Sequence, residues 1–448
     1  MVTGVMMPTI DPSSNPWLQI YFPLALGEPS TPSQLSLQHA LMSVAAYQRA
    51  YREGKSKQDD MKRGFYHEQE ASRVLERFVT HEHPEIQSLR DQCTCLAAAL
   101  GLISIDIFGP RATDCTTRLG LARRVIDMYQ DERSWESNVL SSMLYQIFRC
   151  YETVGSTAKV TTEMTTASQD HSPESDDAPS PDDRNAITRM DTNTAFEKSL
   201  ADARYFILNS SFGVSWRTMS LLQETTKLGT ACSSSNPRDM TREIRSLHQR
   251  LYGVEDDPSD FLAPVSSRRT IPRLDTSSHH SNDSNGVFLP KIISDELIEN
   301  HQLAFHYAVM IYFHRVIPDT YLPHDAESGH RISSRDNCQA LVRKVWDRLE
   351  NIDCLTPRDI QLHRGNVLWP AFIAAAESIR VDLRHRALIW FSKAAKRGVG
   401  NTLRAKEVVM EVWRRVDRQM YPDEELVGMG PVDWRVVMKE MGHSIMLT

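Results

Sequence analysis

Residues 361–420 read QLHRGNVLWPAFIAAAESIRVDLRHRALIWFSKAAKRGVGNTLRAKEVVMEVWRRVDRQM, and this stretch decides the fold. In each of three successive segments the apolar side chains recur every three or four residues, which is the period of an α-helix with one buried face. None of these faces is stable in water, so we expect three helices that pack on one another or on neighbouring helices. The apolar positions are, segment by segment, Leu368, Phe372, Ala375, Ala376 and Ile379; Leu383, Ala387, Leu388, Phe391 and Ala395; and Ala405, Val409, Val412, Trp413, Val416 and Met420.

The ends of these three helices coincide with residues that favour helix boundaries. Pro370 lies in the first turn of the first helix, where the N–H that proline lacks would have no partner in any case. Gly398 and Gly400 provide flexible stops between the second and third helices. Asn401 and Thr402 are predicted N-caps of the third helix, because their side chains can accept hydrogen bonds from its first N–H groups.

The same helical period covers most of the chain, and no apolar alternation of period two reaches a useful length. We therefore predict an all-α fold, organised as a large multi-helix regulatory domain with two long disordered polar insertions. The helical parts are expected at 1–152, 196–252 and 291–448. The segments between them are expected to be a disordered acidic insert at 153–195 and a flexible loop at 253–290.

The prediction of disorder depends on composition. Residues 153–195 carry three basic and eight acidic side chains and no aromatic residue, so they cannot bury enough apolar surface to offset the entropy of ordering. Residues 253–290 are similarly polar and long for a connection. Residues 1–34 are expected to be mostly extended, with an apolar patch at Trp17, Ile20, Tyr21 and Phe22 that docks on the core.

Composition also limits the class of protein. The chain has 448 residues, 41% of them hydrophobic, and a formal net charge of −7, which argues against a surface that binds nucleic acid broadly. Its seven cysteines are scattered and include no Cys-x-x-Cys, which fits thiols in a reducing compartment. We find no signal peptide and no apolar run approaching a membrane span, and we expect a soluble intracellular protein.

One group of residues has the right chemistry for zinc. His81 and His83 are close in sequence to Cys93 and Cys95, and four such side chains could hold the ion. However, the two cysteines fall in a helical pattern, where positions i and i+2 point to nearly opposite sides. We therefore favour ordinary core and surface roles for these residues and predict no metal site.

Other catalytic or ligand-binding patterns are weaker still. Gly398-Val399-Gly400 precedes a helix, as a phosphate-binding loop would, but it follows no strand and lacks the Lys-Ser/Thr pair, so a helix–helix turn is favoured. Asp59-Asp60 runs directly into Met-Lys-Arg, which is unlike a magnesium-binding aspartate face. His279-His280 lies in a polar loop. Since no catalytic constellation is found, we predict that the chain is not an enzyme, and we assign no catalytic or cofactor-binding residues.

Several stretches together resemble the fungal-specific transcription factor domain, the helical region that normally follows a six-cysteine binuclear zinc cluster in fungal regulators. The similarity lies in apolar spacing with a few characteristic letters, repeated in the same order from about residue 15 to the C-terminus. The stretches are NPWLQIYFPLAL (15–26), LQHALMSVAAYQRA (37–50), DQCTCLAAALGLISIDIF (91–108), RLGLARRVID (118–127), VLSSMLYQIFRCYETVG (139–155), YFILNSSFGVSWRTMSLLQE (205–224), GNVLWPAFIAAAES (365–378), EVVMEVWRR (407–415) and VDWRVVMKEMGHSIML (432–447).

The resemblance implies a transcriptional regulator in the nucleus that controls metabolic or secondary-metabolite genes. Its expected partners are transcriptional coregulators or a DNA-binding partner. A homodimer and a small-molecule effector are further expectations. No contact with a membrane is expected. The alternative from another class is a helical scaffold or ligand-binding protein that acts through partner proteins without direct DNA binding.

The sequence departs from the family's pattern at its start. It contains no six-cysteine cluster, and no basic segment with heptads replaces one. No cofactor is therefore expected in this chain. Zinc is expected only if an upstream zinc cluster exists. Two explanations stay open: an upstream coding segment carries the zinc cluster, or the protein acts on DNA through a partner.

Overall fold

The computed structural model is all-helical, with no β-strand in the part of the chain that it describes. The first helical half, as we call residues 15–159, contains η3 (Trp17–Tyr21), α1 (Phe22–Ala25), α2 (Pro32–Arg52), α3 (Lys57–His81), α4 (Leu89–Phe108), α5 (Cys115–Met128) and α7 (Val139–Thr157). The described residues are 15–26, 31–52, 57–81, 88–110, 115–129, 135–136, 138–159, 212–232, 240–253, 291–321, 334–355, 367–420 and 432–447.

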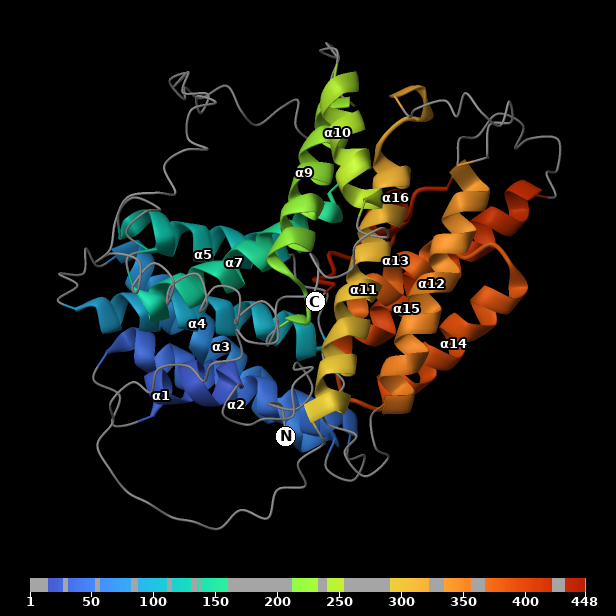
Figure 1. The fold of residues 1–448 in the computed structure, drawn as a ribbon. Coiled ribbons are helices and arrows are strands. Elements are labelled where there is room, and N and C mark those ends of the chain that lie inside the picture. The colour runs from blue at the N-terminus through green and yellow to red at the C-terminus, as the bar shows by residue number, and fades with distance from the viewer. Residues whose placement is uncertain are drawn as a thin grey trace, which may run out of the picture.

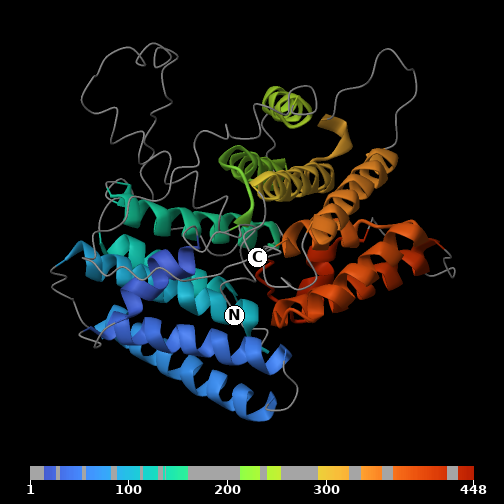
Figure 2. The ribbon, with the colours of Figure 1, turned by 60° about the horizontal axis from the view of Figure 1, so that its bottom comes forward.

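The second helical half comprises residues 212–447. Its elements are α9 (Trp216–Cys232), α10 (Thr241–Tyr252), α11 (Lys291–Val316), the short 3-10 helix η8 (Asp319–Tyr321), α12 (Ser334–Leu355), α13 (Leu368–Ala376), α14 (Val381–Ala395), α15 (Gly400–Met420) and α16 (Trp434–Glu440). Figures 1 and 2 show the blue-to-teal helices of the first half beside the yellow-to-red helices of the second, with α9 and α10 projecting from the junction.

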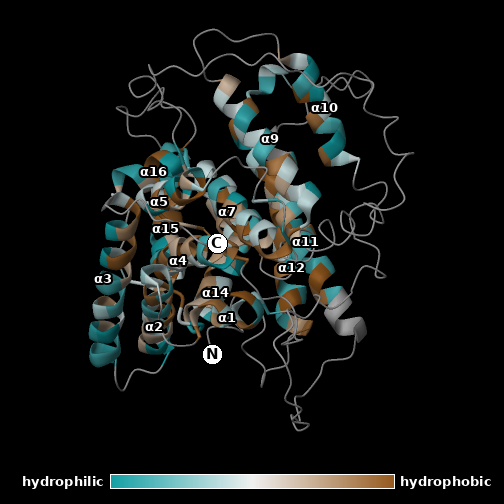
Figure 3. Cartoon of the chain, turned by 90° about the vertical axis from the view of Figure 1, so that its left-hand side faces the viewer, coloured by the Kyte–Doolittle hydropathy of each residue, from teal (hydrophilic) through white to brown (hydrophobic). Residues whose placement is uncertain are grey.

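One helix forms the centre of the first half. Every residue of α4 from Cys93 to Phe108 is buried, and α1, α2, α3, α5 and α7 pack around it. A helix that is apolar on all sides must be covered on all sides, which explains this position. The more polar helices lie outside it, and along α3 and α10 hydrophilic and hydrophobic residues alternate (Figure 3).

The expectation that no apolar segment approaches a membrane span is corrected by α4. Leu89–Phe108 is long and apolar enough to cross a membrane by length and composition, and it is the one such helix within the described residues. However, 89% of its most apolar 18-residue window is buried inside the protein. Burial of this kind is typical of the central helix of a globular core.

The second half is built around α11 and α13. α11 packs against α9, α12 and α13, and every residue of α13 is buried. The three helices predicted within 361–420 are α13, α14 and α15, and α15 also reaches across to α2 and α4 of the first half. The C-terminal end of the chain lies between the halves in both views (Figures 1 and 2).

Three local predictions need correction. Residues around Trp17 are helical rather than extended, although the predicted apolar patch is indeed buried at Trp17, Ile20 and Tyr21. α7 continues to Thr157, past the predicted start of the acidic insert, because Val154 and Thr157 are buried against the core. Most of the two predicted polar inserts, and residues 196–211 of the helical part predicted at 196–252, lie outside the described residues.

The third correction concerns the start of α15. The helix begins at Gly400, so Asn401 and Thr402 lie inside its first turn and are not N-caps. Asn401 is used differently: its side-chain amide donates to the backbone oxygen of Met446 and its oxygen accepts from Arg404. By contrast, Asp433 caps α16, accepting a hydrogen bond from the backbone N–H of Arg435 at 2.8 Å.

Candidate functional site

The residues with metal-binding chemistry are not assembled into a site in the described part of the chain. Cys93 and Cys95 lie in α4 with no exposed surface, and burial raises the pKa of each thiol to about 12. Zinc requires the thiolate, which is therefore disfavoured at neutral pH. The side chain of His81 and the whole of His83 lie outside the described residues, and among those described no three His, Cys, Asp or Glu side chains come together.

The remaining candidate patterns have structural partners. Asp60, half of the Asp59-Asp60 pair, is buried and receives two hydrogen bonds from Arg49, so it joins α3 to α2. Gly398 lies in the connection between α14 and α15. It adopts a φ of 79°, which residues with a side chain rarely adopt. The Gly-Val-Gly segment is thus a helix–helix turn. His279-His280 lies outside the described residues.

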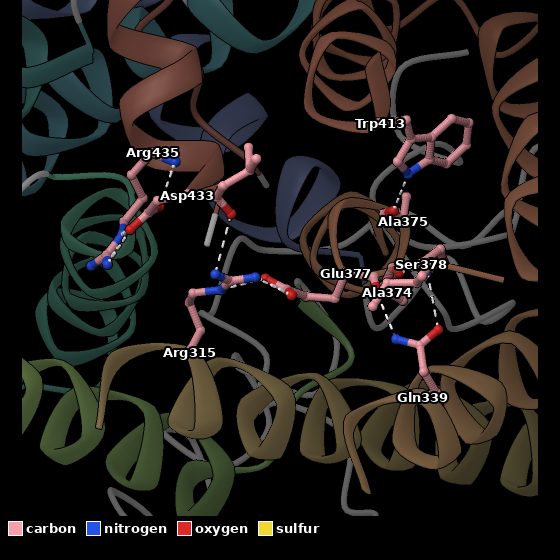
Figure 4. A network of polar contacts seen from close by, with 11 residues as sticks. Arg315, Gln339, Ala374, Ala375, Glu377, Ser378, Trp413, Asp433 and Arg435 are labelled. Atoms are coloured by element: carbon pink, nitrogen blue, oxygen red, sulfur yellow. Dashed lines mark hydrogen bonds and ion pairs between the residues drawn. The ribbon is translucent and has the colours of Figure 1, made fainter. Parts of the chain in front are cut away.

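A largely buried polar cluster lies at the C-terminal end of α13 (Figure 4). Here Arg315 of α11 makes a bidentate ion pair with Glu377, the residue that follows α13. The same guanidinium donates to the backbone oxygen of Val432 at 3.2 Å. Although burial opposes the charged form, the Glu377 carboxylate raises the pKa of Arg315 above its usual value. Arg315 therefore fastens α11 to the segments that follow α13 and precede α16.

A second ion pair stands beside the first. Asp433 binds the guanidinium of Arg435, with 2.6 Å between Oδ2 and Nη2. Burial alone would raise the pKa of Asp433, but the hydrogen bonds and charge of Arg435 lower it below the ordinary value. The charge of Arg315 acts in the same direction. These paired charges fix the start of α16.

The carbonyl groups at the end of α13 are the other half of the cluster. The last four carbonyls of a helix have no partner within it, and when buried they need side-chain donors. Gln339 of α12 donates to the oxygen of Glu377 at 2.7 Å and accepts from the N–H of Ile379 at 3.1 Å. The indole of Trp413 in α15 donates to Ala375 at 2.8 Å. The α13 terminus is thus held by three different helices.

The polar groups of this cluster hold neighbouring helices together, and we call the cluster the clamp at the end of α13. Its acids are paired with arginines, and its carbonyls accept hydrogen bonds. The stretch AAAES at 374–378 was singled out from the sequence only for its apolar spacing. Its polar role was missed, because the partners Arg315, Gln339 and Trp413 come from distant parts of the chain.

A second buried cluster joins helices of the first half. Arg118 of α5 binds both Glu68 and Asp106, each at 3.0 Å, and the hydroxyl of Tyr47 donates to Glu68 at 2.6 Å. Asp106 interrupts the apolar run of α4, and this single acidic letter was the available signal in the sequence. Its backbone oxygen also accepts from Arg404 of α15 at 3.0 Å, so the cluster extends to the junction between the halves.

Comparison with known proteins finds a family and a distant relative, but no similar structure. No solved structure is significantly similar to the chain. One curated relative is the arginine metabolism regulation protein II of Saccharomyces cerevisiae, which is 23% identical over 173 residues, covering 38% of this chain and 16% of the relative. The chain thus spans a small part of that relative's length. The model of the fungal specific transcription factor domain matches residues 2–448, and the chain belongs to this family.

Proposed function

We propose that the chain is the regulatory region of a fungal transcriptional regulator and that it acts in the nucleus without catalysis. The observation that carries the proposal is the family match over residues 2–448, nearly the whole chain. The buried polar clusters support it, because their charged groups are engaged in joining helices. A scaffold of this kind is suited to transmitting contacts between partners.

We further propose that the controlled genes are metabolic. Support comes from the printed name of the yeast relative, which is a regulator of arginine metabolism. Contact with DNA is assigned to a zinc cluster encoded upstream or to a DNA-binding partner, since the net charge of −7 does not favour broad contact with nucleic acid. Coregulators or a second copy of the chain would then bind the helical surface.

The alternative, a scaffold without a role in transcription, is supported by apolar side chains left on the surface. Trp216 at the start of α9 is 52% exposed, and Val381 at the start of α14 is 81% exposed. Tryptophan is enriched where proteins bind one another, and exposed apolar side chains of this kind are available for contact with a partner. They fit either function, so a direct measurement of transcription must separate the two.

The experiment is rapid depletion of the protein in its own host, followed by measurement of nascent transcripts within minutes. The proposal predicts that a limited set of metabolic genes changes before any change in growth. Re-expression of the unaltered chain should restore these transcripts. A transcript profile that responds only after growth has slowed would favour the scaffold.

A further inference from the structure

The helix α10 is attached to the rest of the protein through one face. Along this face Ile244, Leu247 and Leu251 have no exposed surface, and the helix packs against α9 and η8. Figure 1 shows α9 and α10 projecting together at one end of α11. The segments on either side of α10, at 233–239 and 254–290, lie outside the described residues. Within the described part of the chain, the docking of α10 therefore depends on this one face.

The polar contacts of this face with α11 pass through histidine rings. The hydroxyl of Tyr252 and Nε2 of His314 share a hydrogen bond of 2.6 Å. The ring of His248 stacks on that of Tyr252, with 4.4 Å between their centroids. Near the same end of α10, Nε2 of His306 donates to the backbone oxygen of Leu251 at 2.9 Å. Because the ordinary pKa of histidine lies close to neutrality, this attachment can respond to pH.

His314 is the ring for which a proton is most costly. Its Nδ1 atom is buried and has no hydrogen-bond partner within the described residues. A neutral imidazole can leave this nitrogen without a proton, whereas the protonated ring carries an N–H on both nitrogens. Protonation would therefore place a charge and a buried donor where no acceptor is available, which costs free energy. Accordingly, burial lowers the pKa of His314 from 6.5 to about 4, and His248 acts in the same direction.

The charged groups around His314 do not compensate for this cost. Asp319 of η8 favours the protonated ring, but it is exposed, and the pKa of His314 stays at about 4 despite it. Glu224 of α9 is paired with Arg250 of α10, and α13 contains no charged residue. Other charged groups on the packed helices are exposed or have partners elsewhere: Arg242, Glu243, Arg245 and Lys227 are exposed, Arg315 binds Glu377, and Arg343, Lys344, Arg348 and Asp353 contact Asp382, Tyr307, Asn300 and Lys393.

We propose that α10 is a cover on α11 whose docking weakens when His314 takes up a proton. The neutral ring allows the hydrogen bond to Tyr252 and the apolar contacts of α10 to exist together, whereas the charged ring is more stable once α10 has moved away and water reaches it. Release would expose the apolar face of α10 at Ile244, Leu247 and Leu251, and so create a new surface for a partner. Such control would act whether or not the chain regulates transcription.

Proton linkage gives the direction and size of the effect. A released His314 has the ordinary pKa of about 6.5, and the docked one has a pKa of about 4. Because docking lowers the pKa, the docked state is most stable above about pH 6.5 and loses stability as the pH falls towards 4. Between pH 7.5 and pH 5.5, the equilibrium constant for release should rise about tenfold.

The test is hydrogen exchange of the full chain at pH 7.5 and pH 5.5, followed by mass spectrometry and corrected for the intrinsic exchange rate at each pH. A released helix of 12 residues is unstable in water, so release of α10 exposes its amides to exchange. The protection of α10 should fall about tenfold between the two pH values, and that of α4, which reports unfolding of the core, should fall less. Equal loss of protection in both helices, or no loss in α10, would overturn the proposal.

His314→Gln tests the assignment to this ring, because glutamine can still form a hydrogen bond with Tyr252 but does not titrate. In this variant the protection of α10 should be the same at both pH values. His385→Gln is the matched control, since His385 is exposed on α14, and it should keep the wild-type response. A pH response that survives in His314→Gln would refute the assignment. If that variant does not fold, the comparison of α10 with α4 in the wild type still decides whether acid releases α10. Transcription is not measured, so failure here leaves the test of function intact.

Discussion

At the scale of single residues, the glycine that begins α15 sets how closely the two halves approach. A Cβ on Gly400 would lie only 2.3 Å from the backbone oxygen of Gly109. Gly400 begins α15 and Gly109 follows α4, so the two helices would have to separate to make room for it. We expect Gly400→Ala to destabilise the protein by about 2 kcal/mol or more, because α15 must shift away from α4. The change is measured as a lower urea midpoint.

Gly120→Ala provides the matched control for this substitution. Gly120 is exposed in α5, and a Cβ there would meet nothing within 4 Å. Alanine should stabilise the helix at this position by up to about 1 kcal/mol. If both alanine variants changed the midpoint in the same direction, the close approach at Gly400 would not be the cause.

Trp413 is a residue whose burial the sequence predicted and the structure shows, at 5% exposure. Its indole fills the space between α15 and α13 and donates to Ala375. Trp413→Ala should lower the free energy of unfolding by about 3–5 kcal/mol, through the lost contacts and the unsatisfied carbonyl. A Tm that fell by only a degree or so would show that this side chain contributes little to the core.

Asp433 gives the protein a predictable response to acid. Arg435 lowers the pKa of Asp433 in the folded protein. The ion pair therefore stabilises the folded protein at pH values above the unfolded-state pKa of about 3.9. This stabilisation is lost as the pH falls through the lower pKa of the folded state. Asp433→Asn keeps the N-cap but removes the charge, and should cost about 1 kcal/mol at pH 7. This difference should shrink below pH 4, as measured by urea unfolding at both pH values. A difference independent of pH would contradict the account.

At the scale of helices, the clamp at the end of α13 makes a prediction about paired substitution. Glu377→Gln leaves the buried guanidinium of Arg315 without its counter-ion and should destabilise by about 3–5 kcal/mol. Combining it with Arg315→Met removes the unpaired charge and should recover a substantial part of this loss. The measurement is a double-mutant cycle of unfolding free energies. Strictly additive effects would show that the two residues are not coupled.

The helices themselves were largely predictable, whereas the contacts between them were not. The period of three to four residues located α13, α14 and α15 within 361–420. Asn401 was misassigned because its role depends on Met446, which is far away in sequence. The helix at Trp17–Tyr21 was missed because proline and serine around it favoured an extended chain, while burial of its aromatic residues against the core decided the outcome.

The contacts within the polar clusters were even harder to predict from the sequence than the contacts between helices. A sequence pattern reveals residues that lie near one another along the chain, but Arg315, Gln339 and Trp413 meet at α13 only after the helices have packed. The all-α fold, the family and the positions of several helices could be predicted from the sequence, but the contacts within these clusters could not.

At the scale of the whole molecule, the chain is two helical halves joined through α15 and α7. α15 contacts α2 and α4, α7 contacts α9, and the indole of Trp369 in α13 donates to the hydroxyl of Thr157 in α7 at 3.2 Å, so the second half is attached to the first at several places. A ligand or partner that binds across this joint would bias how the halves sit against each other, which is the simplest way for a helical region to pass a signal. Membership in the fungal specific transcription factor domain family places that signal in gene regulation.

The most direct test of this account is chromatin occupancy of the epitope-tagged chain, expressed from its own locus. The account predicts enrichment at the promoters of the same metabolic genes whose nascent transcripts change on depletion, whether the protein reaches DNA through its own upstream segment or through a partner. Absence of enrichment at those promoters, with the tagged protein present in the nucleus and functional, would contradict a role in transcription.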